Sequence, residues 1–485
     1  MPQASQLPLQ TTEQNTHKEL IPCLFHNSHG EAICDVYKNG TRYSYSLWSK
    51  EFEMWLKCYL YDRCSPESKK NIFKKSKINE ILQELEILAE SAPEAELYSD
   101  RVVRYEEKVY LNLGDGKGNA IAIDSTGWKI VRNPPVRFQI SRDIEPLPMP
   151  VQGGKLAELE EITNLNQQQL VLVAGWLLGA LNPNPPYPLL VITGEQGSGK
   201  SSLARMLKQL VDPSKGVLRS QPRDERNLMV AAINTWVLCF DNFSKLSQSL
   251  SDGLCRLSTG NSYVDRVLYS NNQQIVLEAA RPVIITSIAD IVSNGDLMDR
   301  SICLHCDRIS EQQRKSEAEI QARFEQLRPK ILGLLCSAVS QALANRQQVN
   351  LEIKPRMADF AEWVAAAESA LGFESGTFIT AYQANRQTSQ RLTIQDSPVA
   401  LAIQNLLLDR VSWQGTATEL LNIIREFAAE HRYYGDDLPR AANKLSGQLR
   451  KINPGLRTLG IEVILNYKRL GKSGSRIIKI VRIAS

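Results

Sequence analysis

Cysteine is scarce in this sequence, and neither a long apolar run nor a large excess of one charge is present. Nine cysteines in 485 residues are too few for a disulfide scaffold, and their number is odd. We therefore expect reduced thiols and a cytoplasmic protein. The longest apolar run, Leu170 to Leu181, is too short to span a bilayer and is typical of a buried helix. We expect no membrane association, and the polar residues 1–20 show no secretory signal.

The formal net charge is only +4, but the charge is unevenly distributed. From Arg440 to Ser485, eleven Lys or Arg stand against one acid, Glu462, so this segment carries +10. The remaining residues together carry −6. A basic segment on a mildly acidic body predicts a polyanionic partner.

Composition is otherwise globular, with 43% hydrophobic and 23% charged residues. Apolar runs at 189–193, 236–240 and 283–286 suit buried parallel strands, and helical segments lie between them. This alternation predicts an α/β fold with a parallel sheet. The expected parts are a disordered N-terminus (1–20), an accessory α+β domain (21–150), a core with the parallel sheet (151–310), a helical lid or packing region (311–390) and a basic C-terminal domain (396–485).

Turn and breaker residues add local expectations. Asn39-Gly40 predicts a hairpin turn, and the prolines between Pro134 and Pro150 indicate a linker. Pro329 is expected to interrupt a helix, and Pro454-Gly455 to follow one.

The strongest motif is the segment Gly194-Glu-Gln-Gly-Ser-Gly-Lys-Ser201, which fits G-x-x-x-x-G-K-[ST] between an apolar strand and a helix. Its glycines let backbone N–H groups point at phosphate oxygens, and the helix adds its positive end. Lys200 is expected to reach the β- and γ-phosphates, and Ser201 to ligate Mg²⁺. The strand–helix context argues against a chance Gly-rich turn. The expected nucleotide contacts are Gly194, Glu195, Gln196, Gly197, Ser198, Gly199, Lys200, Ser201 and Ser202.

An acid at the end of a neighbouring strand should hold the Mg²⁺ shell. Asp241 ends the run 236–240 and fits this role. The next residue is Asn242, where many such ATPases have a carboxylate that activates water. An amide can orient water but is a poor base, so we expect ATP binding with slow hydrolysis.

Two further residues are candidates for roles around the γ-phosphate. Thr286 ends the third apolar run, where ring ATPases place a polar sensor of the γ-phosphate. A strand-end Thr without a role is the alternative. Arg300 follows Asp296 and precedes another apolar run. It is either a salt-bridged surface residue or, in an oligomer, an arginine finger that acts on the neighbouring subunit.

These motifs occur in an order that resembles a known group of proteins. The order is the 194–201 loop, Asp241-Asn242, the segment 250–260, Arg281-Pro-Val-Ile and Asp296 to Arg300. It resembles ATP-binding proteins of phages, plasmids and prophages, which are similar to superfamily 3 replicative helicases and primase–helicases. The segments 356–363 and 413–416 are also similar.

The resemblance implies an AAA+ core, ATP with Mg²⁺, ring assembly and DNA-dependent activity. It makes Asp241 the Walker B acid, Thr286 the first sensor and Arg300 the finger. Asn242 in place of the usual second acid, and Thr286 where Asn is common, depart from the pattern and affect hydrolysis rather than binding. No primase signature is present, so priming is not expected.

DNA contacts are expected in two places. A run from Thr259 to Leu277 predicts two strands around a polar turn, and Arg266 is the candidate contact in a ring pore, with a salt bridge as the alternative. Three helices and a basic hairpin at 396–485 outline a winged helix. The candidates there are Lys444, Arg450 and Lys451 on the third helix, and Lys468, Arg469, Lys472 and Arg476 on the hairpin. A protein-contact module is the alternative.

Together these signals predict an ATP-dependent, DNA-acting AAA+ ATPase that forms a homo-oligomeric ring, a replicative helicase or initiator of a mobile element. The alternatives are an ATP-switched DNA-binding scaffold that turns ATP over slowly, and a transcription regulator.

Overall fold

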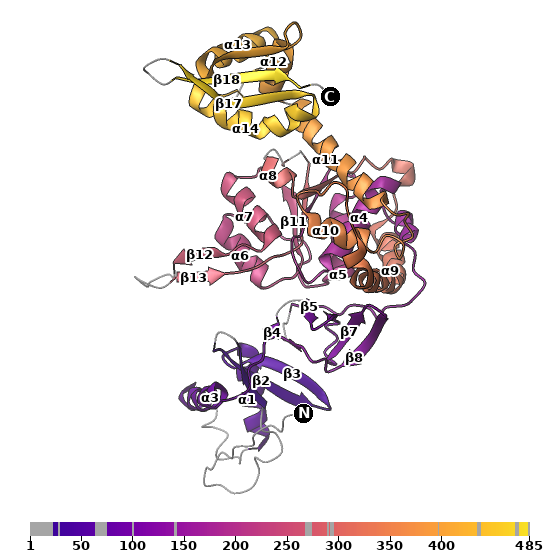
Figure 1. Ribbon diagram of the computed structural model, residues 1–485. Coiled ribbons are helices and arrows are strands. Elements are labelled where there is room, and N and C mark those ends of the chain that lie inside the picture. Colours follow the sequence, from indigo (N-terminus) through magenta and orange to yellow (C-terminus); the bar gives the residue numbers. More distant parts are fainter. Residues whose placement is uncertain are drawn as a thin grey trace.

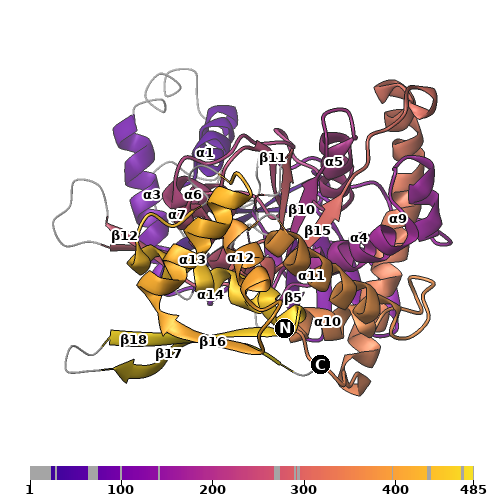
Figure 2. The same cartoon turned by 90° about the horizontal axis from the view of Figure 1, so that it is seen from above.

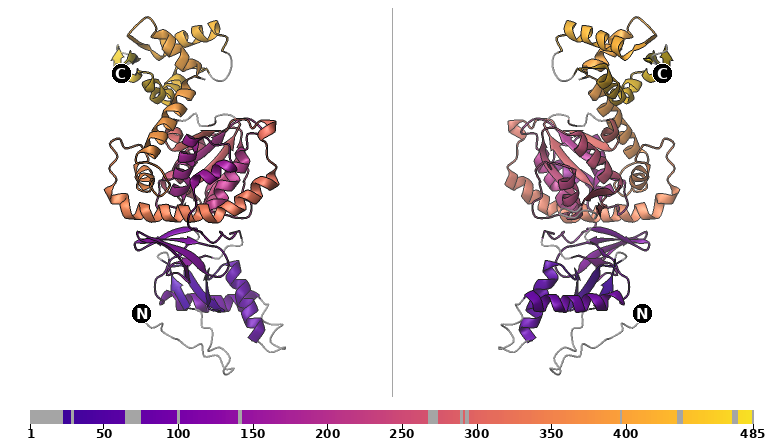
Figure 3. Two further views of the ribbon diagram at one scale, coloured as in Figure 1. Left: turned by 90° about the vertical axis from the view of Figure 1, so that its right-hand side faces the viewer. Right: turned by 90° about the vertical axis from the view of Figure 1, so that its left-hand side faces the viewer.

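The computed structural model describes residues 23–27, 30–63, 75–98, 101–139, 143–266, 274–288, 291, 295–395, 397–433, 438–470 and 475–483. These residues form three tiers, with an N-terminal part, a central part and a C-terminal part stacked along one axis (Figure 1, Figure 3). The segment 1–20, for which disorder was expected, lies outside the described residues.

The N-terminal part begins with a three-stranded antiparallel sheet in the order β1-β2-β3. Its elements are β1 (Cys23–His26), β2 (Ala32–Lys38), β3 (Thr41–Ser46), and the helices α1 (Lys50–Arg63) and α3 (Lys75–Glu90). The hairpin predicted at Asn39-Gly40 is present, and both turn residues have positive φ, as a tight two-residue turn requires. The helices bury an apolar stripe against β2, which gives this module its own small core.

A second antiparallel sheet, in the order β5-β6-β7-β8, completes the N-terminal part. Its strands are β5 (Val102–Tyr105), β6 (Lys108–Asn112), β7 (Asn119–Asp124) and β8 (Gly127–Arg132), and a short parallel pair, β4 (Leu97–Tyr98) with β9 (Arg137–Phe138), lies beside it. Leu111 and Ile121 of this sheet belong to the core of the central part. The other face of the sheet forms a small cluster of its own with Val103, Tyr110, Ala122 and Val136. Residues 21–150 therefore hold two modules, and the second shares one of its faces with the core of the centre.

The proline-rich segment before residue 151 is packed rather than free. Leu147 is buried, and its N–H donates to the carbonyl of Leu113 at 2.9 Å. The N–H of Val151 likewise bonds the carbonyl of Pro329 at 2.9 Å. The segment thus ties the second sheet to the central part.

A parallel four-stranded sheet in the order β11-β14-β10-β15 forms the centre. Its strands are β10 (Leu189–Thr193), β11 (Leu238–Phe243), β14 (Val283–Ser287) and β15 (Ser301–His305). Side chains alternate between the two faces, as strand geometry dictates. Leu190 and Ile192 pack into one core with α4 (Gln167–Ala180) and α5 (Lys200–Val211), while Leu189 and Val191 pack with α6 (Glu225–Ile233) and α7 (Gln248–Thr259). Figure 2 shows these two helix layers on opposite sides of the sheet.

An antiparallel hairpin projects from the central part to the left of α6 (Figure 1). It consists of β12 (Tyr263–Arg266) and β13 (Gln274–Leu277), which pair from Tyr263 with Leu277 to Arg266 with Gln274. The two predicted strands are therefore present. The polar turn between them lies outside the described residues.

The region 311–390, for which helices were predicted, contains α9 (Glu317–Asn345), α10 (Ala358–Ala365) and α11 (Thr377–Gln395). Short 3₁₀ turns are present at Leu156–Glu161, Glu311–Gln313 and Arg346–Gln348. The expectation that Pro329 interrupts a helix is wrong, because α9 runs through it. A methyl group on Gly333, one turn further on, would lie 2.0 Å from the carbonyl oxygen of Val151. Close packing of the segment before residue 154 on this stretch outweighs the local cost of the proline.

The C-terminal part consists of three helices and a three-stranded sheet in the order β16-β18-β17. The elements are α12 (Pro398–Leu406), β16 (Ser412–Thr416), α13 (Ala417–Glu430), α14 (Ala442–Thr458), β17 (Ile461–Leu470) and β18 (Ser475–Arg482). Thr416 caps α13 through a reciprocal pair of hydrogen bonds with Glu419. The part has its own apolar core.

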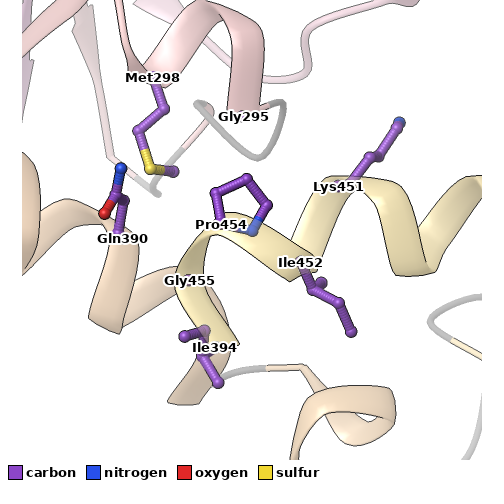
Figure 4. A pocket seen from close by; sticks show the side chains of 8 residues that line it. All are labelled: Gly295, Met298, Gln390, Ile394, Lys451, Ile452, Pro454 and Gly455. Atoms are coloured by element: carbon purple, nitrogen blue, oxygen red, sulfur yellow. The ribbon is translucent and has the colours of Figure 1, made fainter. Parts of the chain in front are cut away.

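The expectation that Pro454-Gly455 follows the third helix is wrong, because α14 continues to Thr458. A methyl group on Gly455 would lie 2.5 Å from Ile394, so α14 crosses α11 at close range there. Figure 4 shows this junction, where Pro454 of α14 lies toward Met298 of α8 (Gly295–Met298) and Gln390 of α11, while the side chain of Lys451 points away from them. The third helix of the C-terminal part, α14, therefore packs against the central part.

Candidate nucleotide site

The loop between β10 and α5 has the backbone geometry that its glycines predict. Gly194, Gly197 and Gly199 have φ values of 146°, 83° and 79°. A methyl group on Gly194 would lie 2.3 Å from the carbonyl oxygen of Cys306, so only glycine fits there. Lys200 opens α5, and its Nζ donates to the carbonyl of Glu195 at 2.6 Å and to Ser198 Oγ at 3.3 Å. The ammonium is therefore held across the mouth of its own loop.

The acid predicted on the neighbouring strand meets this loop. Ser201 Oγ donates to Asp241 Oδ1 at 2.8 Å, which joins α5 to β11. Thr286 Oγ1, on the intervening strand β14, donates to the same carboxylate oxygen. Three side chains far apart in sequence thus converge at the carboxyl ends of parallel strands, where open α/β sheets bind their ligands.

The oxygen atoms of Ser201 and Asp241 fit a magnesium ion. Hydroxyl and carboxylate oxygens are hard ligands, and Mg²⁺ is commonly held by one or two such groups together with substrate phosphates and water. Within the described part of the chain, no group of three or more His, Cys, Asp or Glu could hold a metal alone.

Thr286 is buried beside Asp241, and its hydroxyl both donates and accepts a hydrogen bond. Only 1% of its surface is exposed, and its hydroxyl donates to Asp241 while accepting the backbone N–H of Asn242 at 2.9 Å. These contacts make Thr286 a positioning residue for Asp241. The role of Thr286 as a γ-phosphate sensor stays a prediction.

Asn242 occupies a backbone conformation that sequence reasoning missed. Its φ is 57°, in the left-handed region, and the pairing of β11 with β14 shifts register between Phe240 and Phe243. Asn visits this region more readily than most residues because its short side chain can hydrogen-bond locally. Its exposed side chain points out of the strand, while its N–H supports Thr286.

We expect Asn242→Glu to lower the free energy of unfolding by about 1 kcal/mol, because a Glu is strained at positive φ, while Asn242→Gly should leave it nearly unchanged. Urea unfolding of the three proteins measures this difference.

In the folded Asn242→Glu protein, the added carboxylate should leave ATP turnover similar or raise it, since it can accept a proton from water. A large loss of turnover in a folded Glu variant would show that the amide itself is required.

Arg300 lies at the other end of the sheet from the phosphate loop. Its carbonyl accepts the N–H of Leu189 at the start of β10, so roughly the length of a strand, about 15 Å, separates it from its own loop. Its guanidinium pairs with Asp296 at 2.6 Å, and its side chain is 14% exposed. Arg356 pairs with the same carboxylate oxygen at 2.6 Å. The salt bridge considered from sequence is present.

Two residues beside the loop were not found from the sequence. Asn164 Nδ2 donates to the carbonyl of Ser198 at 3.3 Å and to that of Asp307 at 3.0 Å, which ties the loop to the segment after β15. In that segment, the Arg314 guanidinium lies 3.3 Å from where a methyl group on Gly197 would stand. Neither residue belongs to a motif, so no pattern in the sequence pointed to them.

The candidate DNA contacts of the C-terminal part come from α14 and from the β17–β18 hairpin. Lys444, Arg450 and Lys451 are exposed on α14, and Lys451 lies at the edge of the junction with α8 (Figure 4). Lys468, Arg469 and Arg476 are exposed on the β17–β18 hairpin. Lys472 lies outside the described residues, and Arg266 is placed only by the backbone of β12.

Two family models of known proteins match segments of this chain. Residues 155–389 match the family model of an actinomycete integrative conjugative element replication protein, RepA. Residues 399–485 match the model of the RepA C-terminal domain of the same elements. The chain is therefore a replication protein of a mobile element, and the N-terminal residues before 155 lie outside both matches.

No curated protein sequence matches the chain. Two apo structures of the C-terminal region of NrS-1 align with this chain. The first alignment covers 95% of this chain and 96% of the NrS-1 chain, at 12% identity and a TM-score of 0.38. The second covers 96% of this chain and 97% of the NrS-1 chain, at 11% identity and a TM-score of 0.38. In the described residues, no helix is both long enough and apolar enough to cross a membrane.

Proposed function

We propose that this replication protein is an ATP-dependent, DNA-acting AAA+ ATPase, a replicative helicase or initiator that works as a hexameric ring in the cytoplasm. ATP is its substrate and Mg²⁺ its cofactor. The observation that carries the proposal is the convergence of Lys200, Ser201 and Asp241, which come from a glycine loop, a helix start and a neighbouring strand. This is the set of groups that binding a nucleoside triphosphate with Mg²⁺ requires.

Each residue has a defined task in this proposal. The N–H groups of the 194–201 loop and the N-terminal end of α5 bind phosphate oxygens. Lys200 exchanges its contacts with Glu195 and Ser198 for the β- and γ-phosphates. Ser201 and Asp241, already 2.8 Å apart, orient the ion, which neutralises charge that develops on the phosphates.

The position of Arg300 favours action between subunits. Because about one strand length separates it from its own loop, it would stabilise transition-state charge only in a neighbour. To do so it must leave Asp296. Arg356 also pairs with Asp296, so the carboxylate keeps a cation when Arg300 leaves.

The β17–β18 hairpin supports DNA as the partner. In its register Arg469 lies directly opposite Arg476, next to Lys468 opposite Ile477. Like charges in directly opposed positions destabilise a strand pair, so the isolated hairpin carries a cost that a polyanion would relieve. The arrangement of three helices with this hairpin favours a winged helix, with the hairpin along phosphates.

We expect neutralisation of Lys468, Arg469 and Arg476 by Ala to weaken duplex DNA binding with little dependence on sequence. The slope of log K against log salt should flatten by about 0.9 for every phosphate that the variant no longer neutralises. Fluorescence anisotropy across a salt series measures this. Arg457→Ala is the matched control, because Arg457 is in the same domain but pairs with Glu462 at 2.7 Å. An unchanged slope in the hairpin variant would make this domain a protein-contact module.

Two assays separate the proposal from its alternatives. ATP turnover that rises with single-stranded DNA, together with strand displacement, supports the helicase. Tight Mg²⁺-dependent ATP binding without DNA-stimulated turnover would instead favour the ATP-switched scaffold or regulator. Asn242, which is a poor base, is the observation that favours this second candidate.

A further inference from the structure

The two sheets of the N-terminal part line an open polar hollow of about 470 Å³. It lies between the β2–β3 hairpin and the loop that joins β6 to β7. The lining residues are Lys38, Asn39, Thr41, Tyr43, Gly116, Lys117, Asn119 and Arg132. We call this hollow the junction site. It lies in the part of the chain that neither family match covers.

The walls of the junction site are held together by contacts between the two sheets. Arg132 on β8 donates to the carbonyl of Asn39 at 2.9 Å and to Thr41 Oγ1 at 2.7 Å. Thr41 donates to the carbonyl of Lys117 at 3.3 Å, and the Tyr43 hydroxyl to that of Gly116 at 2.9 Å. The hollow is therefore built by the fold rather than left by one loose loop.

The charge of the junction site is one-sided. Three of its lining residues are cations and none is an acid, although residues 23–150 as a whole carry acids and bases in nearly equal number. In the described part of the chain, neither Lys38 nor Lys117 has an ion-pair partner, and both are exposed. Asp115, in the same loop as Lys117, accepts the N–H of Lys117 and the side-chain amide of Asn119.

We propose that the junction site binds backbone phosphates of single-stranded DNA. Clustered cations without acids, beside an aromatic ring such as that of Tyr43, are the composition of grooves that track single strands. A flexible single strand can bend so that its phosphates follow the curved lining of a hollow of this size, whereas the phosphates of a rigid duplex stay fixed on a broad cylinder. The site lies outside the nucleotide site and the basic C-terminal hairpin, and the inference rests on the proposed DNA partner.

Lysine acetylation followed by mass spectrometry tests the proposal on the full chain. With oligo-dT at about ten times its Kd, acetylation of Lys38 and Lys117 should fall about tenfold, because the sites are then mostly occupied. Lys50, exposed on α1 outside the hollow, is the internal control and should not change. Protection of Lys38 and Lys117 only by duplex DNA, or only by ATP with Mg²⁺, would overturn the proposal.

The same acetylation experiment separates this inference from the proposed function. Lys468 and Lys479 report on the C-terminal hairpin. If DNA protects them but leaves Lys38 and Lys117 unchanged, the junction site is wrong and the DNA partner stands. If no lysine is protected by either form of DNA, both fail.

A paired substitution gives an independent result. Lys38→Ala with Lys117→Ala should weaken oligo-dT binding and flatten its salt slope by about 0.7 for each phosphate that is no longer neutralised. Neither ammonium group has an ion-pair partner within the described residues, so folding should be unaffected. Lys50→Ala is the matched control. Equal slopes in the paired variant and the control would overturn the proposal.

Discussion

Replacing Lys200 by Ala is expected to raise the Kd for ATP by about 100-fold or more. Hydrogen bonds to a charged group contribute about 1.5–3 kcal/mol each, and Lys200 can reach two phosphates from its place at the start of α5. The backbone N–H groups of the loop remain, so weak binding should persist at high concentration. Titration with a fluorescent ATP analogue in the presence of Mg²⁺ measures the change.

Lys215→Ala is the matched control for this experiment. Lys215 lies shortly after α5 and is exposed, so its loss removes an equal charge from the same region without touching the loop. Its Kd for ATP should equal that of the wild type. Because Lys200 also satisfies the carbonyl of Glu195, circular dichroism should confirm that Lys200→Ala is folded. Unchanged affinity in a folded Lys200→Ala protein would rule out the nucleotide assignment.

The phosphate loop could be predicted because its signal is local. Strand, glycines, lysine and helix follow one another within a few residues, so the sequence alone contains their geometry. Asp241 could be added because parallel strands bring their carboxyl ends to one edge. The apolar runs also located β10, β11, β14 and β15, since fully buried strands are apolar on both faces.

What the sequence could not reveal depends on contacts between distant segments. Pro329 and Pro454 each lie inside a helix, because packing on Val151 and on α11 outweighs the local preference. Arg314 reaches the phosphate loop only through the course of the chain after β15. The positive φ of Asn242 results from the strand irregularity beside Thr286, which no single-residue pattern encodes.

A buried ion network is a further example, and it joins the N-terminal part to the C-terminal end of α5. Asp212 immediately follows α5, and its carboxylate accepts Arg101 Nε at 3.0 Å and Lys208 Nζ at 3.2 Å. Arg101 comes from the edge of the second N-terminal sheet and also donates to the carbonyl of Pro213 at 2.6 Å. All three side chains are at most 4% exposed. From sequence alone, each is an ordinary surface charge.

Asp212 is the centre of this network. Burial raises its pKa, but Lys208, Arg101 and the N–H of Val237, which donates to the carboxylate at 2.9 Å, together outweigh burial and lower the pKa below its ordinary value. Burial also lowers the pKa of Arg101 and of Lys208, and the Asp212 carboxylate partly offsets this for both. The two cations are therefore tolerated in the interior because one carboxylate lies between them.

Asp212→Asn is expected to lower the free energy of unfolding by about 3–5 kcal/mol, the usual cost of removing one member of a buried ion pair. The amide keeps the shape of the side chain but leaves two buried cations without a counter-charge. Urea unfolding at neutral pH measures the loss, and Asp252→Asn, an exposed acid on α7, should change stability by less than about 0.5 kcal/mol. A loss no larger than that of this control would mean that hydration, rather than Asp212, stabilises the two cations.

The pH dependence gives the same prediction a second readout. Because the folded pKa of Asp212 is lowered, its stabilising contribution is fully present above the unfolded value of about 3.9 and is lost as the pH falls through the lower folded value. The difference between wild type and Asp212→Asn should therefore be constant near neutral pH and shrink only in acid. Adding Lys208→Met to Asp212→Asn should recover part of the loss, since only Arg101 then lacks a counter-charge. A difference that stays constant down to strong acid would show that the loss of stability comes from packing rather than from the carboxylate charge.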